Sequence, residues 1–386
     1  MLSSTIINNI TIICIDNIQE IDKYKNKWNR LAAENPPHLV TCSHAYVSTY
    51  IKHFLNPGER FFLYFAFIND ALVGVLPLIL EPRRSKIKGC YYILRAPFNC
   101  DTFGVGPIIP IEFRDQIFNK ILSTVWLNHP EVRYIEFHDI STKSNPDALL
   151  NQSIHIHQDL RIGRYIPCNG NFQNYIKTLS KNFRSNQRKA QNKLEKLPGV
   201  SFEIITDTST YNQYLTEFAN IEALSWKGQK GTAIQCADKM MAFYTDLCSQ
   251  LSRQGWLEWH ILKADNKTIA MNLAIRFHES VFLLKLGYDE AYSKCSPGGM
   301  LLQYALEHAF NDNQIKEFDI LTNEPWYDNW KMRNREYLHL RIYNNKRTQS
   351  FLAGYIPDRL IQVARNNPVL RSSVRALRNQ LKKVQA

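Results

Sequence analysis

The sequence predicts a mixed α/β fold, with α+β-type mixed sheets, built as two similar domains in tandem. First, 386 residues suffice for two ordinary domains, and a chain that is 45% hydrophobic and 12% aromatic has ample material for a core. Second, stretches with the strand period and stretches with the helix period alternate along the chain. Third, an order of elements in the first half recurs in the second half.

The repeated order begins with a β-hairpin. In the first half, apolar residues 61–68 and 71–80 flank Asn69-Asp70. In the second half, residues 257–263 and 269–275 flank Asp265-Asn266-Lys267. Asn and Asp favour the tight turns that join antiparallel strands. Each hairpin is followed downstream by a helical stretch and a short apolar strand, at 113–127 and 133–140 and again at 300–311 and 315–321. This repetition predicts one domain that has been duplicated, although convergence of ordinary α/β patterns would produce the same order.

The remaining elements of the second half follow the same reasoning. Residues 172–197 predict one or two helices that end at Pro198-Gly199, a strong helix stop. Residues 211–226 and 238–254 carry apolar side chains at helical spacing, and residues 281–287 predict a strand. We therefore expect a first domain at 1–165, a second at 166–345 with a joint at Asn169-Gly170-Asn171, and a basic helical tail at 346–386.

The charge of the chain favours polyanionic partners. The formal net charge is +12, and the basic residues concentrate in residues 181–196 and in the tail. Such patches suit phosphorylated ligands, nucleic acid or anionic lipid, although a solvated helix face would carry the same charges. The eight cysteines include no CxxC pair, so we expect neither a zinc site, nor any other metal site, nor a disulfide framework. With no signal peptide and no long apolar run, the predicted location is cytoplasmic, with peripheral membrane contact through the tail.

The strongest local signal for ligand binding is Ser296-Pro297-Gly298-Gly299, which lies between a predicted strand and a predicted helix. Ser296 fits the N-cap and Pro297 the first turn, while the glycines leave backbone N–H groups open. A helix N-terminus of this kind attracts phosphate, so a pyrophosphate-bearing donor such as coenzyme A would bind there. An ordinary capped helix would explain the same four residues.

Two further segments contain candidate site residues. Glu222 and Trp226 share a helix face that leads into a glycine-bracketed loop, where they would line a substrate pocket, unless Trp226 belongs to the core. Asp319 lies inside an apolar strand, where an unpaired carboxylate is costly, so it is either salt-bridged or catalytic. Tyr327 and Lys331 are four residues apart and would share a helix face.

Several of these motifs, taken in order, resemble a known family. They are Leu179-Ser-Lys-Asn-Phe-Arg, Trp226-Lys-Gly, Lys285-Leu-Gly-Tyr-Asp, Ser296-Pro-Gly, Phe318-Asp and Trp326-Tyr. Together with Asn56-Pro-Gly and Gly74-Val-Leu-Pro-Leu they cover residues 35–345 and resemble the GNAT-type acyltransferases of the cellulose-biosynthesis CelD-like family, relatives of the Fem aminoacyltransferases. The resemblance implies two tandem GNAT-like domains and an acyl-CoA donor, acetyl-CoA included, in the second. It implies an acceptor tied to polysaccharide or cell-envelope synthesis, such as an amino-sugar.

Site residues are assigned by combining this resemblance with the chemistry of acyl transfer. Asp289 or Asp319 is expected to be the base, Tyr288 or Tyr327 to protonate the leaving thiolate, and Lys285 to position a carboxylate. No GxSxG motif occurs and Cys295 lacks an obvious paired histidine, so direct transfer is favoured over a covalent acyl-enzyme. The sequence departs from the family at Tyr327-Asp328, where Tyr-Lys is expected, and in its phosphate loop. The predicted substrate-binding residues are Arg184, Arg188, Glu222, Trp226, Lys227, Trp326 and Lys331.

Two alternatives to an acyl-CoA enzyme remain open. A Fem-like transferase would use aminoacyl-tRNA, which the basic segment 181–196 suits, whereas the acyl-CoA prediction expects no nucleic-acid partner. A non-catalytic adaptor would instead lie on a membrane surface or a polysaccharide complex through the basic tail. In the first half, Arg83-Arg84-Ser85-Lys86 follows Leu80 and no glycine pair stands there, so the first domain is predicted to complete the acceptor cleft rather than to bind a second donor.

Overall fold

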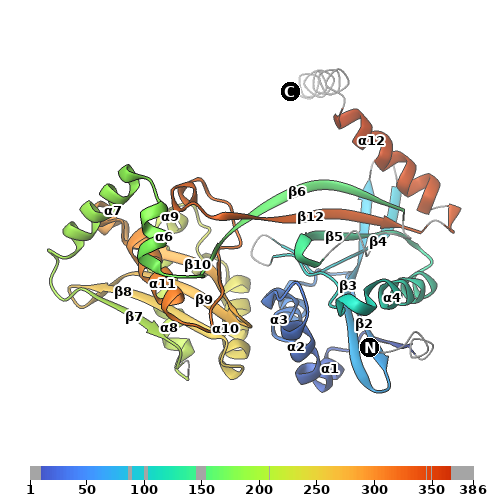
Figure 1. Ribbon diagram of the computed structural model, residues 1–386. Helices are drawn as coiled ribbons and strands as arrows, with labels where there is room; N and C mark the ends of the chain where they lie inside the picture. The colour runs from blue at the N-terminus through green and yellow to red at the C-terminus, as the bar shows by residue number, and fades with distance from the viewer. Residues whose placement is uncertain are drawn as a thin grey trace. The chain divides into compact units, whose positions relative to one another are not determined.

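The computed structural model describes residues 10–85, 89–99, 103–144, 154–207, 209–344, 346–348 and 350–366 (Figure 1). The chain divides into two compact units, and neither is a single stretch of sequence. Among the described residues, those from 10 to 16, from 56 to 161 and from 337 to 366 belong to unit 1. Those from 17 to 55 and from 162 to 336 belong to unit 2.

Unit 1 is built on a mixed sheet in the order β1-β2-β3-β4-β5-β12. Only β4 and β5 pair in parallel, and the other neighbours are antiparallel. The predicted hairpin is confirmed as β2 and β3, joined by Asn69 and Asp70 at positive φ of 47° and 64°. Helix α4 packs Ile117 and Ile121 on one face of the sheet. The strands are β1 (Ile10–Ile15), β2 (Arg60–Ile68), β3 (Ala71–Ser85), β4 (Gly89–Arg95), β5 (Val132–Ser141) and β12 (Arg333–Tyr343), and the longer helices are α4 (Arg114–Asn128) and α12 (Ile356–Asn366).

In unit 2 the strands of the sheet follow the order β6-β11-β10-β9-β8-β7. Strands β10 and β11 are parallel, and the other pairs recorded in this sheet are antiparallel. The second predicted hairpin is confirmed as β8 and β9, with Asp265 and Asn266 at φ of 53° and 57°. The strands are β6 (Ile154–Pro167), β7 (Ser201–Ile205), β8 (Leu257–Ala264), β9 (Lys267–Phe277), β10 (Ser280–Tyr288) and β11 (Glu317–Asp319).

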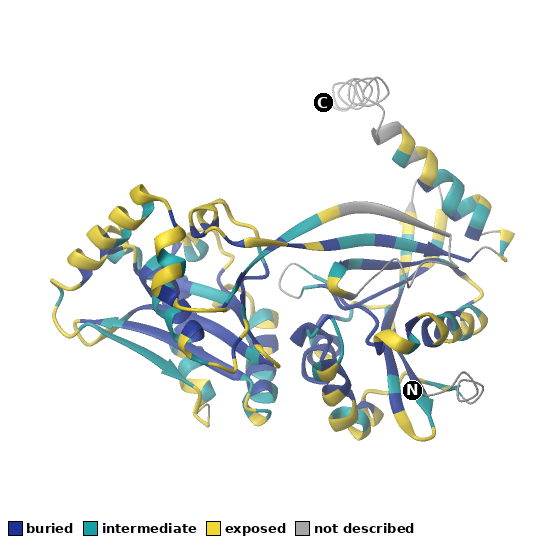
Figure 2. Cartoon of the chain, in the orientation of Figure 1, coloured by how far each residue is buried: buried dark blue, intermediate teal, exposed yellow. Residues whose placement is uncertain are grey.

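Helices cover both faces of the unit 2 sheet, whose strands are largely buried in Figure 2. On one face, Leu302 and Leu306 of α11 join the core that contains Phe318. On the other face, the ring of Phe218 in α8 lies 6.0 Å from that of Trp259. The helices are α1 (Ile18–Ile21), α2 (Lys25–Glu34), α3 (His44–Phe54), α6 (Phe172–Thr178), α7 (Lys181–Leu194), α8 (Tyr211–Ala223), α9 (Trp226–Gln229), α10 (Asp238–Arg253) and α11 (Pro297–Asn311).

Short helical turns connect these elements. Two of them, η7 and η8, lie next to candidate site residues. The turns are η2 (Asp22–Tyr24), η3 (Val40–Cys42), η4 (Ile111–Phe113), η5 (Thr142–Ser144), η6 (Ile234–Cys236), η7 (Glu290–Cys295), η8 (Pro325–Trp330) and η9 (Ser350–Tyr355).

The strands of the two units repeat one order of elements, as the duplication predicts. Strands β1 to β5 with α4 in unit 1 correspond to β7 to β11 with α11 in unit 2, including the parallel last pair. The strand that follows each of these sets is exchanged: β6 follows β5 but pairs with β11, and β12 follows β11 but pairs with β5. The strand of unit 1 that corresponds to β10 is therefore β4. Arg83 and Arg84, which the sequence places opposite the Ser296–Gly299 segment, lie within β3 and not after β4.

The compact units differ from the predicted linear domains of 1–165 and 166–345. Residues 17–55 belong to unit 2 because α3 packs on α10, where the ring of Phe54 lies 4.7 Å from that of Phe243. Such packing between distant segments leaves no mark in a local sequence pattern. Of the predicted helical tail, α12 is present, and residues 367–386 lie outside the described residues. None of the described helices is both long enough and apolar enough to cross a membrane.

Candidate active site

Strand β10 separates from its parallel neighbour β11 near the middle of the unit 2 strands. It pairs with β11 only over Ser280–Phe282, whereas its pairing with β9 continues to Tyr288, with a bulge between Leu283 and Lys285. In the part of the chain that the structure describes, no strand covers the other edge of β10 beyond Phe282. Backbone groups on this free edge can bind an extended ligand, and the edge from Leu283 to Tyr288 spans about 17 Å at roughly 3.3 Å per residue.

A buried carboxylate lies next to this part of β10. The side chain of Glu222, at the end of α8, has no exposed surface. Its Oε1 accepts a hydrogen bond of 2.8 Å from Lys227 Nζ and lies 3.8 Å from Lys285 Nζ, and its Oε2 accepts from the backbone N–H of Ile234 at 2.8 Å. Lys227 Nζ also donates to the Leu286 carbonyl of β10 at 3.0 Å. Glu222 thus fixes two ammonium groups beside the strand.

Two glycines permit this arrangement. A Cβ on Gly287 would lie 3.0 Å from both the N and the Cα of Glu222, so only glycine lets α8 lie this close to β10. A Cβ on Gly228 would lie 1.9 Å from the Ala223 carbonyl oxygen. Ser225 completes the bend between α8 and α9, since its hydroxyl donates to the Glu222 carbonyl and accepts from the Lys227 N–H.

The aromatic ring of Tyr244 supports the second lysine. Lys285 Nζ lies 5.0 Å from the centre of this ring, which belongs to α10 and is fully buried. An ammonium group over an aromatic face is attracted by the ring quadrupole. The side chains of Lys227 and Lys285 remain 23% and 12% exposed, so both stay reachable from solvent. The pair can stabilise negative charge that develops beside the free edge of β10.

The predicted donor segment forms the start of α11. Ser296 occupies the N-cap position with Pro297 in the first turn, as predicted, but Ser296 has a left-handed φ of 49° and its side chain makes no capping hydrogen bond. Gly298 packs against β10, since its Cβ position lies 3.4 Å from Leu286 and 3.5 Å from Tyr288. The first turn of a helix presents N–H groups that its own carbonyls do not use. Phosphate oxygens fit such a turn.

Helix α7 lies beside the same helix start. The Nε2 atom of Gln187 is 3.9 Å from the Cβ position of Gly299, and Lys193 Nζ donates to the Lys294 carbonyl. Arg184 and Arg188 are exposed on α7 and carry the positive charge of this helix toward solvent. Ser180 caps α7 by accepting from the Phe183 N–H at 3.2 Å.

Two of the predicted proton-transfer residues stand at the end of β10. Burial, and then the charge of Glu290, raise the pKa of Tyr288, so its phenol keeps its proton at neutral pH. Asp289 is partly buried and begins η7, where its Oδ1 accepts from the Ala291 N–H at 2.9 Å. In the described chain, no hydrogen bond uses the Oδ2 atom of Asp289.

The other predicted base is held in a buried ion pair. Asp319 is 0% exposed, and its Oδ2 lies 2.8 Å from Arg335 Nη1, while its Oδ1 accepts from the Leu321 N–H at 2.7 Å. Arg335 also pairs with Glu317 and lies over the ring of Tyr165. The sequence left open whether Asp319 is salt-bridged or catalytic, and the geometry favours the salt bridge.

The remaining predicted residues are not brought together into one cluster. Tyr327 is 5% exposed in the core, and burial raises its pKa. Its ring centre lies 3.8 Å from that of Trp326, which is 41% exposed, and the two rings are tilted by 35°. Lys331 ends η8 at a φ of 48° and is exposed. Trp226 is 45% exposed and lies under Lys230, so it is not a core residue.

The structure thus unites Glu222, Lys227 and Lys285 in one cluster, and places Tyr288 against the start of α11. Sequence reasoning missed Tyr244 and Gln187. Tyr244 has the helical spacing of a core residue of α10. Gln187 lies in the basic segment 181–196, which was interpreted through its charged residues alone. Neither residue carried a local signal that could have identified it.

A cluster of potential metal ligands lies in unit 1, where the sequence predicted none. Glu136, His138 and His339 each offer a ligand atom within 4.8 Å of the others. Glu136 already accepts from Arg341 Nε at 2.6 Å and from Arg83 Nη2 at 2.8 Å. Two guanidinium groups on the carboxylate oppose a divalent cation there.

Comparison with known proteins supports the class of enzyme. The family described as acetyltransferase (GNAT) domain matches residues 181–332, which is less than half of the chain. This stretch contains β10, α11 and the Glu222 cluster. The match supports the predicted class of enzyme, an acyltransferase, with residues 181–332 as its GNAT-like part.

Solved structures show the same fold at low sequence identity. FemX has a TM-score of 0.60 at 10% identity, over 89% of this chain and all of its own (100%). The C-terminal domain of a protein described as a lysylphosphatidylglycerol synthetase, from Agrobacterium fabrum, has a TM-score of 0.52 at 9% identity, over 88% of this chain and 96% of its own. A protein of unknown function from Bacteroides thetaiotaomicron has a TM-score of 0.51 at 10% identity, over 86% of this chain and 100% of its own. No curated protein matches the chain in sequence.

Proposed function

We propose that unit 2 transfers an acyl group from acyl-CoA, acetyl-CoA included, directly to an amine or hydroxyl of an amino-sugar, polysaccharide or cell-envelope precursor. The observation that carries the proposal is the separation of β10 from β11 at Phe282, followed by the glycine-containing start of α11. An extended thioester arm would pair with the free edge of β10, with its phosphates at Gly298 and Gly299. The CelD-like specialisation, and a cytoplasmic setting with peripheral membrane contact, belong to this proposal.

The transfer needs a base, an acid and a group that stabilises the oxyanion. The acceptor nitrogen or oxygen attacks the thioester carbonyl and gives up its proton, the C–S bond breaks, and the thiolate takes a proton. We assign the base to Asp289, because its Oδ2 is unused among the described groups, and the acid to Tyr288, because it is protonated at neutral pH. Lys285 and Lys227, held by Glu222, would stabilise the oxyanion.

A single set of assays tests this assignment. Acetyl-CoA is added to the full chain to measure thermal stabilisation, and transfer to glucosamine is followed by thiol release. Asp289→Asn should lower kcat by about 10²-fold or more while donor binding persists, since general bases contribute about 10²–10⁴. Full turnover in this variant would remove Asp289 as the base. Absence of stabilisation by acetyl-CoA, together with absence of thiol release with any acyl-CoA, would refute the donor.

The second candidate is a Fem-like, aminoacyl-tRNA-dependent transferase. The exposed cations of α7, which include Arg184 and Arg188, favour it because attraction to an RNA backbone is electrostatic. Binding of charged tRNA that falls steeply with salt, and that weakens when both arginines become glutamine, would support this donor. Competition by acetyl-CoA at the start of α11 would instead support the first proposal.

A further inference from the structure

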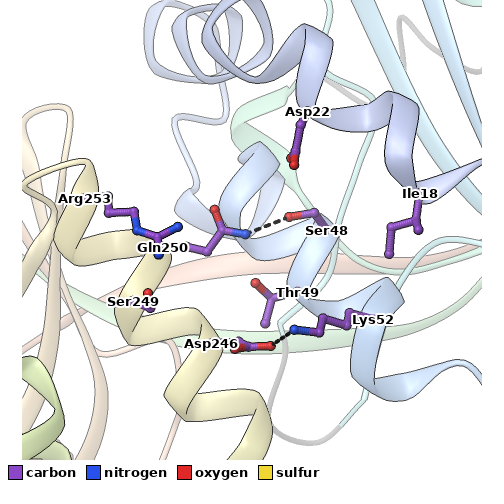
Figure 3. A pocket seen from close by; sticks show the side chains of 9 residues that line it. All are labelled: Ile18, Asp22, Ser48, Thr49, Lys52, Asp246, Ser249, Gln250 and Arg253. Carbon is purple, nitrogen blue, oxygen red and sulfur yellow. Dashed lines mark hydrogen bonds and ion pairs between the residues drawn. The ribbon is translucent and has the colours of Figure 1, made fainter.

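Unit 2 contains a cavity of about 330 Å³ whose walls are α3 and α10 (Figure 3). Ile18 of α1 and Asp22 of η2 supply the remaining wall. The volume falls at the lower end of the range of about 300–1,000 Å³ that is common for small-molecule sites. Ile18 is the sole apolar side chain in the lining, so an apolar ligand does not fit.

Hydroxyl and amide groups line the middle of this cavity. Gln250 of α10 and Ser48 of α3 point toward one another, and Gln250 Nε2 donates to Ser48 Oγ at 3.4 Å (Figure 3). Thr49 Oγ1 donates to the Ala45 carbonyl and keeps its lone pairs for a ligand. In the described chain, no hydrogen bond uses Gln250 Oε1 or the hydroxyl of Ser249. These neutral donors and acceptors match the hydroxyl groups of a polyol.

The charges around the cavity balance. Lys52 and Arg253 carry positive charge, and Asp22 and Asp246 carry negative charge. Burial raises the pKa of Asp246, but hydrogen bonds from Lys52 and His53 outweigh it and hold the pKa below its usual value. A phosphate would be repelled by the two carboxylates and a metal cation by the two basic groups. The balance favours a neutral ligand.

The carboxylate of Asp22 lines the cavity and contacts a histidine. It lies 3.0 Å from the Nε2 atom of His44, but burial lowers the pKa of His44 to about 4, so this imidazole is neutral at physiological pH. Arg253 has no ion-pair partner among the described residues. The Arg253 guanidinium and the Asp22 carboxylate, whose side chain is 78% exposed, can each form charge-assisted hydrogen bonds with ligand hydroxyls.

The cavity is separate from the Glu222 cluster. Asp246, Ser249, Gln250 and Arg253 lie at helical spacing on one face of α10. Tyr244, which contacts Lys285, lies two residues before Asp246 and so projects from a different face of the helix. A ligand in the cavity would be bound away from the free edge of β10.

We propose that this cavity binds a neutral saccharide unit of about hexose size. Vicinal hydroxyls of such a ligand would bind Asp246 Oδ1, Gln250 Oε1 and Ser249, with Arg253 at the rim. The inference does not depend on the identity of the acyl donor.

Saturation-transfer NMR on the full chain tests the proposal with methyl β-glucoside and N-acetylglucosamine. Both sugars should receive saturation, while glucose 6-phosphate and glycine should not. The double variant Ser249→Val/Gln250→Leu should weaken sugar binding about tenfold or more, because two hydrogen-bonding groups are lost. Thr216→Val, an exposed substitution on α8, is the matched control and should bind normally.

Three results would overturn the inference. They are absence of saturation for both neutral sugars, unchanged binding in the double variant, and stronger binding of glucose 6-phosphate or glycine than of the sugars. If the double variant does not fold, Arg253→Gln replaces it, because Arg253 is exposed, and it should weaken binding. Thermal stabilisation by acetyl-CoA, measured in parallel, should be the same in all folded variants, so failure here is distinguishable from failure of the proposed donor.

Discussion

Replacement of Glu222 by alanine is the sharpest test of the cluster beside β10. The substitution removes the acceptor of the Ile234 N–H and the negative charge between Lys227 and Lys285. The variant therefore leaves the buried N–H of Ile234 without its acceptor and both ammonium groups without the carboxylate that lies between them.

The expected cost follows from the burial of each group. A buried N–H without a partner costs about 1–3 kcal/mol. Breaking a fully buried ion pair costs about 3–5 kcal/mol. Because the two lysine side chains are 23% and 12% exposed, the loss of their ion pairs costs less, toward the range of about 0–1 kcal/mol for surface pairs. We expect Glu222→Ala to lower the free energy of unfolding by about 3 kcal/mol. Glu222→Gln keeps an acceptor for Ile234 and should cost about half as much.

Urea unfolding followed by tryptophan fluorescence measures these differences, because Trp259 is buried in unit 2. The matched control is Glu203→Ala, which breaks a pair with Lys263 in which both side chains are 35% exposed. This control should stay within about 1 kcal/mol of the wild type. An alanine variant at position 222 that is as stable as the control would refute the assigned role of Glu222, as would a glutamine variant no more stable than the alanine variant.

Three more outcomes follow from the packing of unit 2. Gly287→Ala should lower the free energy of unfolding by about 1–3 kcal/mol, because its Cβ meets the α8 backbone at 3.0 Å. The control Gly106→Ala, in unit 1, has its nearest contact at 3.9 Å and should stay within about 0.5 kcal/mol of the wild type in urea unfolding. Equal effects of the two substitutions would contradict the close approach of Gly287 to α8. Asp319→Asn should lower the free energy of unfolding, measured by calorimetry, by about 3–5 kcal/mol, yet leave kcat of the folded protein unchanged. A large loss of kcat without a loss of stability would show that Asp319 is catalytic. Burial raises the pKa of Glu258, but the hydrogen bond from His260 and nearby positive charges hold this pKa below its usual value. The ionised Glu258 therefore stabilises the fold fully above about pH 5, and this contribution is lost as the pH falls. Glu258→Gln should make the free energy of unfolding depend less on pH in the acid range, and an unchanged dependence would argue against the pairing with His260.

The elements that sequence reasoning predicted best are those whose signal is local. Both hairpins were predicted from their turn residues, and Asn69-Asp70 and Asp265-Asn266 adopt the positive φ values that such turns require. The helix that starts at Pro297 was predicted from its proline and the preceding serine. Each of these signals lies within a few residues of the feature that it specifies.

The exchange of segments between the units could not be predicted in this way. Strand β12 pairs with β5 although about two hundred residues separate them, as the register of Leu340 with Phe137 shows. Residues 17–55 pack in unit 2 through contacts such as that of Tyr46 with Phe243. Dividing the sequence into consecutive domains cannot predict either contact. The role of Asp319 stayed open for the same reason, because its partner Arg335 lies in a strand of its own.

Two of the short motifs that resemble an acyltransferase family supply residues to the Glu222 cluster. Trp226-Lys-Gly contributes Lys227, which pairs with Glu222, and Gly228, which allows the bend after α8. Lys285-Leu-Gly contributes the second ammonium group and the close approach at Gly287. Motifs separated by almost sixty residues thus meet on a single carboxylate beside the free edge of β10. The order of loosely matching residues was informative because each motif supplies one side of the same buried charge cluster, and loss of either glycine should disturb both lysines together.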